Sequence, residues 1–178
     1  MGRVFNRWIK RKEGTTAVEF ALVGIPFVLM IVGTIEMSLM FTAQAVLHES
    51  TFNAARLIRT GQIQTGAVEG GETAFREAVC EFAALMIPCD RIQFQVQQVP
   101  SFGDAGDMPP AEFDDDGNLE DQGFDPGSVS EVVLIRVAYN YPVITPLMQP
   151  MLADSGRTTR SMMSTIVLQN EPYEFEDD

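Results

Sequence analysis

The feature that most constrains this fold is an apolar run from Phe20 to Ile35 that contains no charged residue. Its 16 residues are fewer than the roughly 20 that span a bilayer, but apolar sequence continues past Glu19 on one side and past Glu36 on the other. A secretory signal peptide would end in a small-residue cleavage site, and the residues after this run offer only a weak one. We therefore expect a membrane-spanning helix over residues 15–45, surrounded by a lipid bilayer.

Basic residues are concentrated on one side of the apolar run. Five of the 12 Lys and Arg residues precede Gly14, namely Arg3, Arg7, Lys10, Arg11 and Lys12. By the positive-inside rule, the N-terminus should be cytoplasmic and the rest of the chain should lie on the outer side of that membrane. The chain has a net charge of −13 and should repel phosphates, so no nucleic-acid partner is expected.

The junction between the basic segment and the apolar run is typical of a processing site at a membrane surface. It contains Gly14, Thr15, Glu19 and Phe20. Cleavage after Gly14 would remove the five basic residues and create an α-amino group on Thr15 that is mostly protonated near neutral pH. Residues four apart are neighbours on a helix, so this ammonium could neutralise Glu19 of its own or an adjacent chain. The alternative is that Glu19 reaches interfacial water without such a partner.

These residues resemble a known family. A basic leader, the pattern Gly-x-x-x-x-Glu-Phe and an apolar helix are similar to the prepilin peptidase site of type IV pilin-like proteins. The closer resemblance is to the TadE-like pseudopilins of the tight-adherence (Flp, type IVb-like) pilus system. It rests on the junction, a following proline, a second glutamate and an Ala-Ala-Arg sequence, here Pro26, Glu36 and Ala54, Ala55 and Arg56. It covers residues 14 to about 58, and the segment from Asn170 to Tyr173 is similar to the family's usual ending.

The resemblance implies a non-enzymatic minor pilin or pseudopilin that is required for pilus assembly. Its implied partners are a prepilin peptidase, other pseudopilins, the major pilin and the inner-membrane pilus assembly platform. The implied location is the bacterial inner membrane, with one span, a cytoplasmic N-terminus and a periplasmic C-terminal domain, or the pilus after processing. The related TadG-like proteins usually carry a much larger outer region, so the modest length of 178 residues favours TadE.

Two residues within the apolar helix have competing interpretations. Pro26 predicts a kink or a loosened turn, which would suit transfer from lipid into a fibre, although proline is tolerated in membrane helices without such a role. Glu36 lies 17 residues beyond Glu19, about 25 Å along a helix, so the two carboxylates should mark the two faces of the membrane. We expect Glu36 to be a solvated boundary residue rather than a contact with another subunit.

Helical sequence continues into the outer domain. Neither proline nor glycine occurs from Phe41 to Thr60, so the first helix should extend from about Thr16 to Thr60. Its predicted buried stripe consists of Leu47, Thr51, Ala54 and Ile58. A second helix is expected from Glu72 to Met86, ended by Pro88, with a buried face formed by Phe75, Val79, Phe82 and Met86.

The two cysteines, Cys80 and Cys89, fall on the side of the membrane where disulfides persist. We predict that they form a disulfide, which would contribute about 2.5 to 3 kcal/mol by the chain-entropy model. With a single histidine in the chain, they cannot make a usual four-ligand zinc site.

Three segments are predicted to be strands. Apolar residues alternate with glutamines from Ile92 to Gln97, which indicates a half-buried strand. Similar alternation occurs from Glu131 to Tyr141 and from Thr158 to Gln169. We therefore predict an α+β fold, in which a pilin-like long N-terminal helix, transmembrane in its inner half, packs against a small antiparallel sheet with a second short helix. The expected divisions are a leader over 1–14, the span over 15–45 and an outer domain over 46–170.

An acidic segment rich in Gly and Pro, residues 101–130, separates the first two strands. Its alternating oxygen ligands make weak calcium candidates, namely Asp114, Asp116, Asn118 and Glu120. The spacing does not fit an EF-hand loop, which needs glycine at its sixth position and glutamate at its twelfth. We expect a solvated, flexible loop here and a frayed acidic tail over 171–178.

No catalytic constellation or cofactor motif is apparent, so neither an enzymatic activity nor a cofactor is predicted. Three hypotheses about function remain. The first is a processed pseudopilin, the second is an unprocessed single-pass scaffold, and the third is a membrane-anchored periplasmic module that binds calcium or another ligand through the acidic loop.

Overall fold

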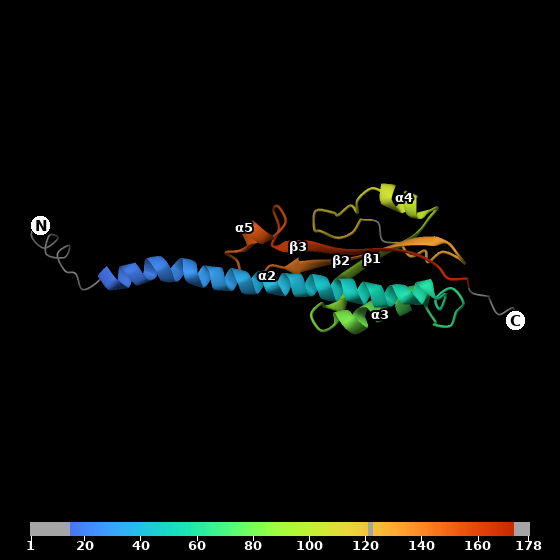
Figure 1. Cartoon of the computed structure of the whole chain (residues 1–178), viewed down its shortest axis with the longest axis horizontal. Coiled ribbons are helices and arrows are strands. Elements are labelled where there is room, and N and C mark those ends of the chain that lie inside the picture. Colours follow the sequence, from blue (N-terminus) through green and yellow to red (C-terminus); the bar gives the residue numbers. More distant parts are fainter. Residues whose placement is uncertain (1–14, 121–122, 173–178) are drawn as a thin grey trace, which may run out of the picture. The chain divides into compact units, whose positions relative to one another are not determined.

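The computed structural model describes residues 15–120 and 123–172. It contains α2 (Thr15–Arg59), α3 (Gly71–Ala83), η2 (Cys89–Arg91), β1 (Ile92–Val99), α4 (Phe102–Asp107), β2 (Val132–Pro142), α5 (Gln149–Leu152) and β3 (Thr159–Gln169) (Figure 1). The predicted α+β class is confirmed, with a long apolar helix, a small antiparallel sheet and a second helix. The chain divides into two compact units, residues 1–38 and 39–178.

The long helix α2 has nearly the predicted bounds. It continues through Pro26 without interruption, so the proline does not end it. It ends at Arg59, two residues before Gly61, whose positive φ of 74° suits a residue without a side chain. There the backbone N–H of Gln62 donates to the carbonyl of Leu57 over 3.1 Å, which caps the last turn.

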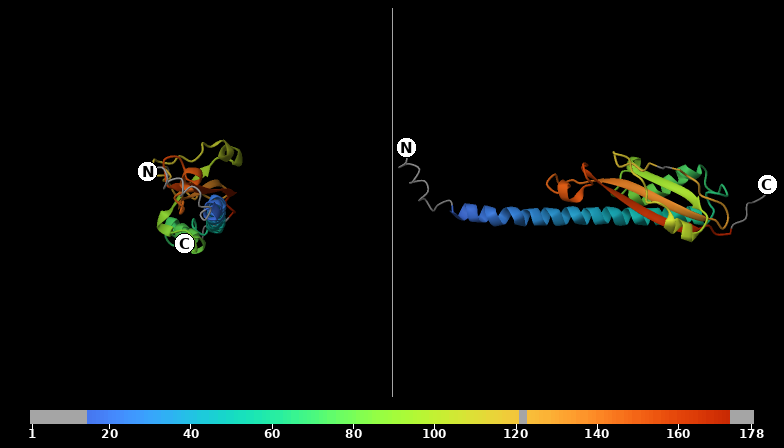
Figure 2. Two further views of the ribbon diagram at one scale, coloured as in Figure 1. Left: turned by 90° about the vertical axis from the view of Figure 1, so that its left-hand side faces the viewer. Right: turned by 90° about the horizontal axis from the view of Figure 1, so that it is seen from above.

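The sheet has the order β1-β2-β3, and both pairings are antiparallel. Gln95, Arg136 and Thr165 are direct partners across it. In the second unit, α2 and α3 lie on one face of the sheet, while α4 and the chain around it lie on the other (Figures 1 and 2). The central strand β2 is therefore covered on both faces, and its residues from Val132 to Tyr139 are all buried.

The main core lies between the sheet and the two helices. The predicted stripe on α2, formed by Leu47, Thr51, Ala54 and Ile58, is confirmed, since all four residues are fully buried. Three phenylalanines from different elements pack beside it. The ring of Phe75 lies 5.2 Å from that of Phe94 and 5.8 Å from that of Phe124, measured between centroids. Such edge and tilted contacts add to the stabilisation from apolar burial.

The buried face of α3 differs from the prediction at its C-terminal end. Phe75 and Val79 are buried as expected, but Phe82 is 44% exposed and Met86 is 38% exposed, so that part of the prediction was wrong. The helix ends at Ala83, and Ile87 then enters the core from the following turn. The predicted disulfide between Cys80 and Cys89 is confirmed, with Cα atoms 5.6 Å apart.

The expected half-buried pattern of β1 holds for Gln93 and Gln97, which are half-buried, but not for Gln95. Gln95 is buried, and Gln93 donates to the side chain of Asn118 and accepts from the backbone N–H of Leu119. Within the acidic segment, α4 and two isolated bridges give part of the expected loop a regular structure, while nearly all of its described residues are exposed or half-buried. One bridge places Phe124 along Val96, where it covers the free edge of β1.

The core assignment on α3 can be tested by removing two phenylalanine rings. Because Phe75 is fully buried, Phe75→Ala should lower the free energy of unfolding by about 3–5 kcal/mol. Phe82→Ala is the matched control and should cost far less, since its ring is partly in water. Thermal and denaturant unfolding of the detergent-solubilised chain measures both. Equal losses would contradict this assignment of the helix face.

The disulfide should stabilise the second unit by restricting its unfolded state. Cys80→Ser should lower the free energy of unfolding by about 2.5 kcal/mol, because the loop that the bond closes is short. The control is a reducing agent, which should lower the melting temperature of the natural chain to that of the variant. A reductant that changes both proteins equally, or neither, would argue against a stabilising bond.

Candidate functional site

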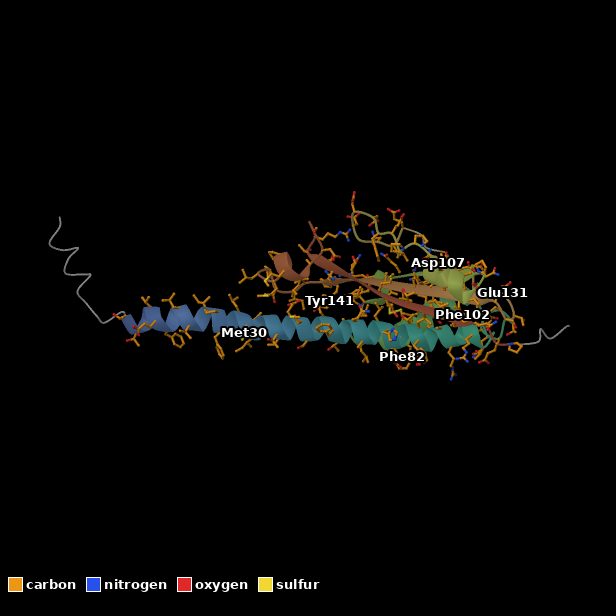
Figure 3. All side chains as sticks on the ribbon, turned by 45° about the horizontal axis from the view of Figure 1, so that its top comes forward. Met30, Phe82, Phe102, Asp107, Glu131 and Tyr141 are labelled. Atoms are coloured by element: carbon orange, nitrogen blue, oxygen red, sulfur yellow. A yellow bond between two sulfur atoms is a disulfide. The ribbon has the colours of Figure 1, made fainter. Side chains whose placement is uncertain are left out.

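The exposed apolar part of α2 is the most unusual surface among the described residues. Its most apolar stretch of 18 residues has no buried residue, and the helix is long and apolar enough to cross a membrane. The large exposed side chains include Phe20, Leu22, Val23, Phe27 and Met30. Figure 3 labels Met30, which is 70% exposed. Residues 15–38 would extend about 36 Å as a helix, slightly more than the hydrocarbon thickness of a bilayer.

The predicted processing residues lie at the start of this helix. Gly14 and the basic leader fall outside the described residues. Thr15 is the first residue of α2, and Glu19 and Phe20 follow within its first two turns, all three exposed. The first turn of α2 contains no acidic residue. Thr15 and Glu19 are therefore one turn apart on the same side of the helix, as predicted.

Glu36 differs from the expectation. Its side chain is only 3% exposed, so the prediction of a solvated boundary residue was wrong. A buried carboxylate must be hydrogen-bonded or paired to be tolerated, and Glu36 does have a polar interaction. Periodicity could not reveal this, because Glu36 follows a run whose other residues are mostly exposed.

The Ala-Ala-Arg sequence lies near the end of α2. Ala54 and Ala55 are buried, and their small side chains allow neighbouring elements to approach the helix closely. Arg56 is exposed. One turn later, the side chain of Arg59 lies 3.2 Å from Glu171, and the backbone N–H of Glu171 donates to the carbonyl of Arg59 over 2.8 Å. This fastens the C-terminal segment to the end of α2.

Asn170 holds two segments of the second unit together through hydrogen bonds, a role that was not predicted from the sequence. Its side chain is buried, and its amide donates to the carbonyls of Pro126 and Ser128, both over 2.9 Å. The carbonyl of Pro126 also accepts from Gln64, in the turn after α2. Asn170 and Gln64 thus hold the segment before β2 between β3 and the end of α2. In the sequence, the one signal for this role was that the segment 170–173 is similar to the usual ending of TadE-like proteins.

The four calcium candidates are not gathered into a metal site. Both carboxylate oxygens of Asp114 accept from Asn118, one from its backbone N–H over 2.7 Å and one from its side chain over 3.0 Å. These bonds, the side-chain one first, lower the pKa of Asp114 below its usual value. Asp116 and Glu120 are exposed. Within residues 15–120 and 123–172, no group of three or more His, Cys, Asp or Glu residues could hold a metal ion.

Arg136 is a buried cation on the outer face of β2. Its guanidinium donates to the side-chain oxygen of Gln95 over 3.2 Å and to the carbonyl of Pro109 over 2.8 Å. It borders a cavity of about 400 Å³ that is also lined by Glu112 and Glu120. Both glutamates are exposed and carry charge opposite to Arg136, so the cavity has no single dominant charge. Through these two hydrogen bonds, Arg136 connects the acidic segment to the sheet.

Comparison with known proteins finds a similarity over the first part of the chain. No curated protein and no solved structure matches the chain. The family model described as TadE-like protein matches residues 14–56, from the predicted cleavage residue to the Ala-Ala-Arg sequence. Over residues 14–56, the chain is therefore similar to TadE-like proteins.

Proposed function

We propose that this chain is a processed minor pilin or pseudopilin that is required for assembly of a tight-adherence pilus. The observation that carries the proposal is that three features occur together along α2. The segment matched by the TadE-like model begins at the predicted cleavage residue and includes the exposed apolar stretch, and it ends inside the folded second unit. One helix thus joins a membrane anchor to a folded domain. The role is structural and non-enzymatic.

The proposed topology has one span. Residues 1–14 form a cytoplasmic leader, residues 15–45 cross the bacterial inner membrane, and residues 46–170 form the periplasmic domain. The basic leader supports this orientation through the positive-inside rule. The disulfide between Cys80 and Cys89 supports it independently, because such bonds persist in the periplasm and are rare in the cytoplasm.

Cleavage after Gly14 would change the electrostatics at the start of α2. The new ammonium on Thr15 would sit at the positive end of the helix dipole, where a cation is unfavourable. Glu19 is exposed one turn away and could offset both this cost and its own cost in a lipid surrounding. We propose that this pair forms within one chain or between neighbouring subunits, and that it favours assembly.

The proposed partners follow from this arrangement. A prepilin peptidase removes the leader, and the inner-membrane assembly platform receives the processed chain. The major pilin and other pseudopilins then contact the apolar surface of α2. Lipid tails and the apolar sides of helices are similar surroundings, so the same exposed residues can face either of them. Removing the basic leader lowers the cost of that transfer.

The processing step can be tested by co-expression with the cognate prepilin peptidase. Gly14→Leu should block cleavage, because a bulky side chain before the scissile bond hinders the approach of the peptidase to the backbone. Gly24→Ala is the matched control within the apolar helix, where an added methyl group meets Phe20 at an ordinary 3.6 Å. Mass spectrometry of the purified membrane form reads the first residue.

The expected first residue is Thr15 for the natural chain and for Gly24→Ala, but Met1 for Gly14→Leu. An intact natural chain in the presence of active peptidase would contradict the proposal and favour an unprocessed scaffold.

The role of Glu19 can be separated from cleavage. Glu19→Gln should still give a processed chain that begins at Thr15 but should strongly reduce pilus assembly, because the ammonium of Thr15 loses its partner. Glu49→Gln is the control, since Glu49 is an exposed acid on the same helix. Fibres are counted by electron microscopy after complementation of a deletion strain. Normal fibre numbers with Glu19→Gln would rule out the proposed pair.

A further inference from the structure

The connection between β2 and β3 carries an exposed apolar surface that the anchor does not explain. No charged residue occurs between Arg136 and Asp154. Within this stretch Leu147 is 59% exposed and Met151 is 78% exposed, and Ile144 is also exposed. The second unit is otherwise acidic, so a charge-free apolar surface of this kind indicates a contact.

The strand register shows at which end of the second unit this connection lies. Gln44 of α2 donates to the carbonyl of Met163 over 3.0 Å, and the carbonyl of Arg59 accepts from Glu171 over 2.8 Å. The earlier residue of α2 thus contacts the earlier position in the chain around β3, and the later residue contacts the later position. The two elements therefore run in the same direction. β3 begins at Thr159, about 13 Å before Met163 along the strand. The connection precedes Thr159, at the end where α2 enters the second unit.

The figures agree with this placement. In Figures 1 and 2, α5 lies at one end of the sheet, and the turn after α2 lies at the other. Figure 3 labels Tyr141 and Phe102 at opposite ends of the sheet, and Tyr141 is on the side of the connection. Phe41 of α2, near the start of the second unit, is 69% exposed and adds an aromatic ring near that end.

We propose that the β2–β3 connection, residues 143–153, is a second membrane contact that inserts Leu147 and Met151 into the outer interface of the bilayer. The proposal rests on the single-span topology given above. The chain enters the second unit at Leu39, so the proposed anchor joins the second unit at this end. A segment without charge can enter that interface without the desolvation cost of a carboxylate, whereas most of the acidic unit cannot.

The position of the connection in the second unit favours lipid over a protein partner. The chain passes from the apolar helix into the second unit at the same end at which the connection exposes its apolar side chains. Contact at a second point would restrict rotation and tilting of the periplasmic unit about α2, and would thereby orient it relative to the membrane.

The contact can be measured in the full chain with a fluorescent label. Both natural cysteines are paired, so one added cysteine provides a unique thiol. The environment-sensitive probe NBD is attached to Leu147→Cys and to the control Phe102→Cys. Phe102 is 54% exposed, closely matching Leu147, but it borders a cavity with Val99 and Gln169 at the opposite end of the sheet. The chains are reconstituted into phosphatidylcholine vesicles with or without lipids that carry a doxyl quencher near the headgroup.

We expect a blue-shifted emission at position 147 that the doxyl lipids quench, and a water-like, unquenched emission at position 102. Water-like emission at position 147 would overturn the proposal. A blue shift without quenching would also overturn it, because the label would then lie against protein rather than lipid.

A third label separates this inference from the topology on which it rests. Val28→Cys carries the probe in the exposed apolar part of α2 and should be quenched by lipids with the doxyl group deep in the acyl chain. Quenching at position 28 without quenching at position 147 would leave the anchor intact and reject only the second contact. Loss of quenching at both positions would reject the anchor as well. Thermal unfolding of each labelled chain verifies that it is folded.

Discussion

One helix that must satisfy two different surroundings is the constraint on which the rest of this structure depends. The first part of α2 exposes apolar side chains on nearly every side, and the later part buries a single stripe against the sheet. A helix satisfies all of its internal backbone hydrogen bonds by itself, so it can cross from one surrounding to the other without a break. The sheet, α3 and the connecting segments then serve to cover only the later part.

The second unit is closed by contacts that link distant parts of the chain at the end of α2. Glu171 binds Arg59 through both a side-chain ion pair and a backbone hydrogen bond. Asn170 and Gln64 share the carbonyl of Pro126. The exposed ion pair alone would contribute little. The buried amide of Asn170 matters more, because breaking its bonds would leave desolvated polar groups without partners.

Features that depend on a few consecutive residues could be predicted from the sequence, whereas features that depend on contacts with distant segments could not. The long helix and the three strands were predictable because the apolar spacing that defines each of them lies within a few consecutive residues. The exposure of Phe82 was not, because it depends on α3 ending at Ala83 and on Ile87 entering the core from the next turn. The burial of Gln95 depends on a segment that returns from beyond residue 107 to cover the sheet. The alternation of glutamines alone cannot report such coverage.

The two acids of the apolar helix illustrate the same limit and sharpen the functional argument. In sequence, Glu19 and Glu36 appear equivalent, since each borders the charge-free run. In the structure Glu36 is buried and has a polar partner, whereas Glu19 is exposed. Only Glu19 would therefore present an uncompensated carboxylate to lipid or to another apolar helix. If the chain is cleaved after Gly14 as proposed, the new ammonium at Thr15 would lie one helical turn from Glu19 and could neutralise that carboxylate, an effect that removal of the leader alone would not provide.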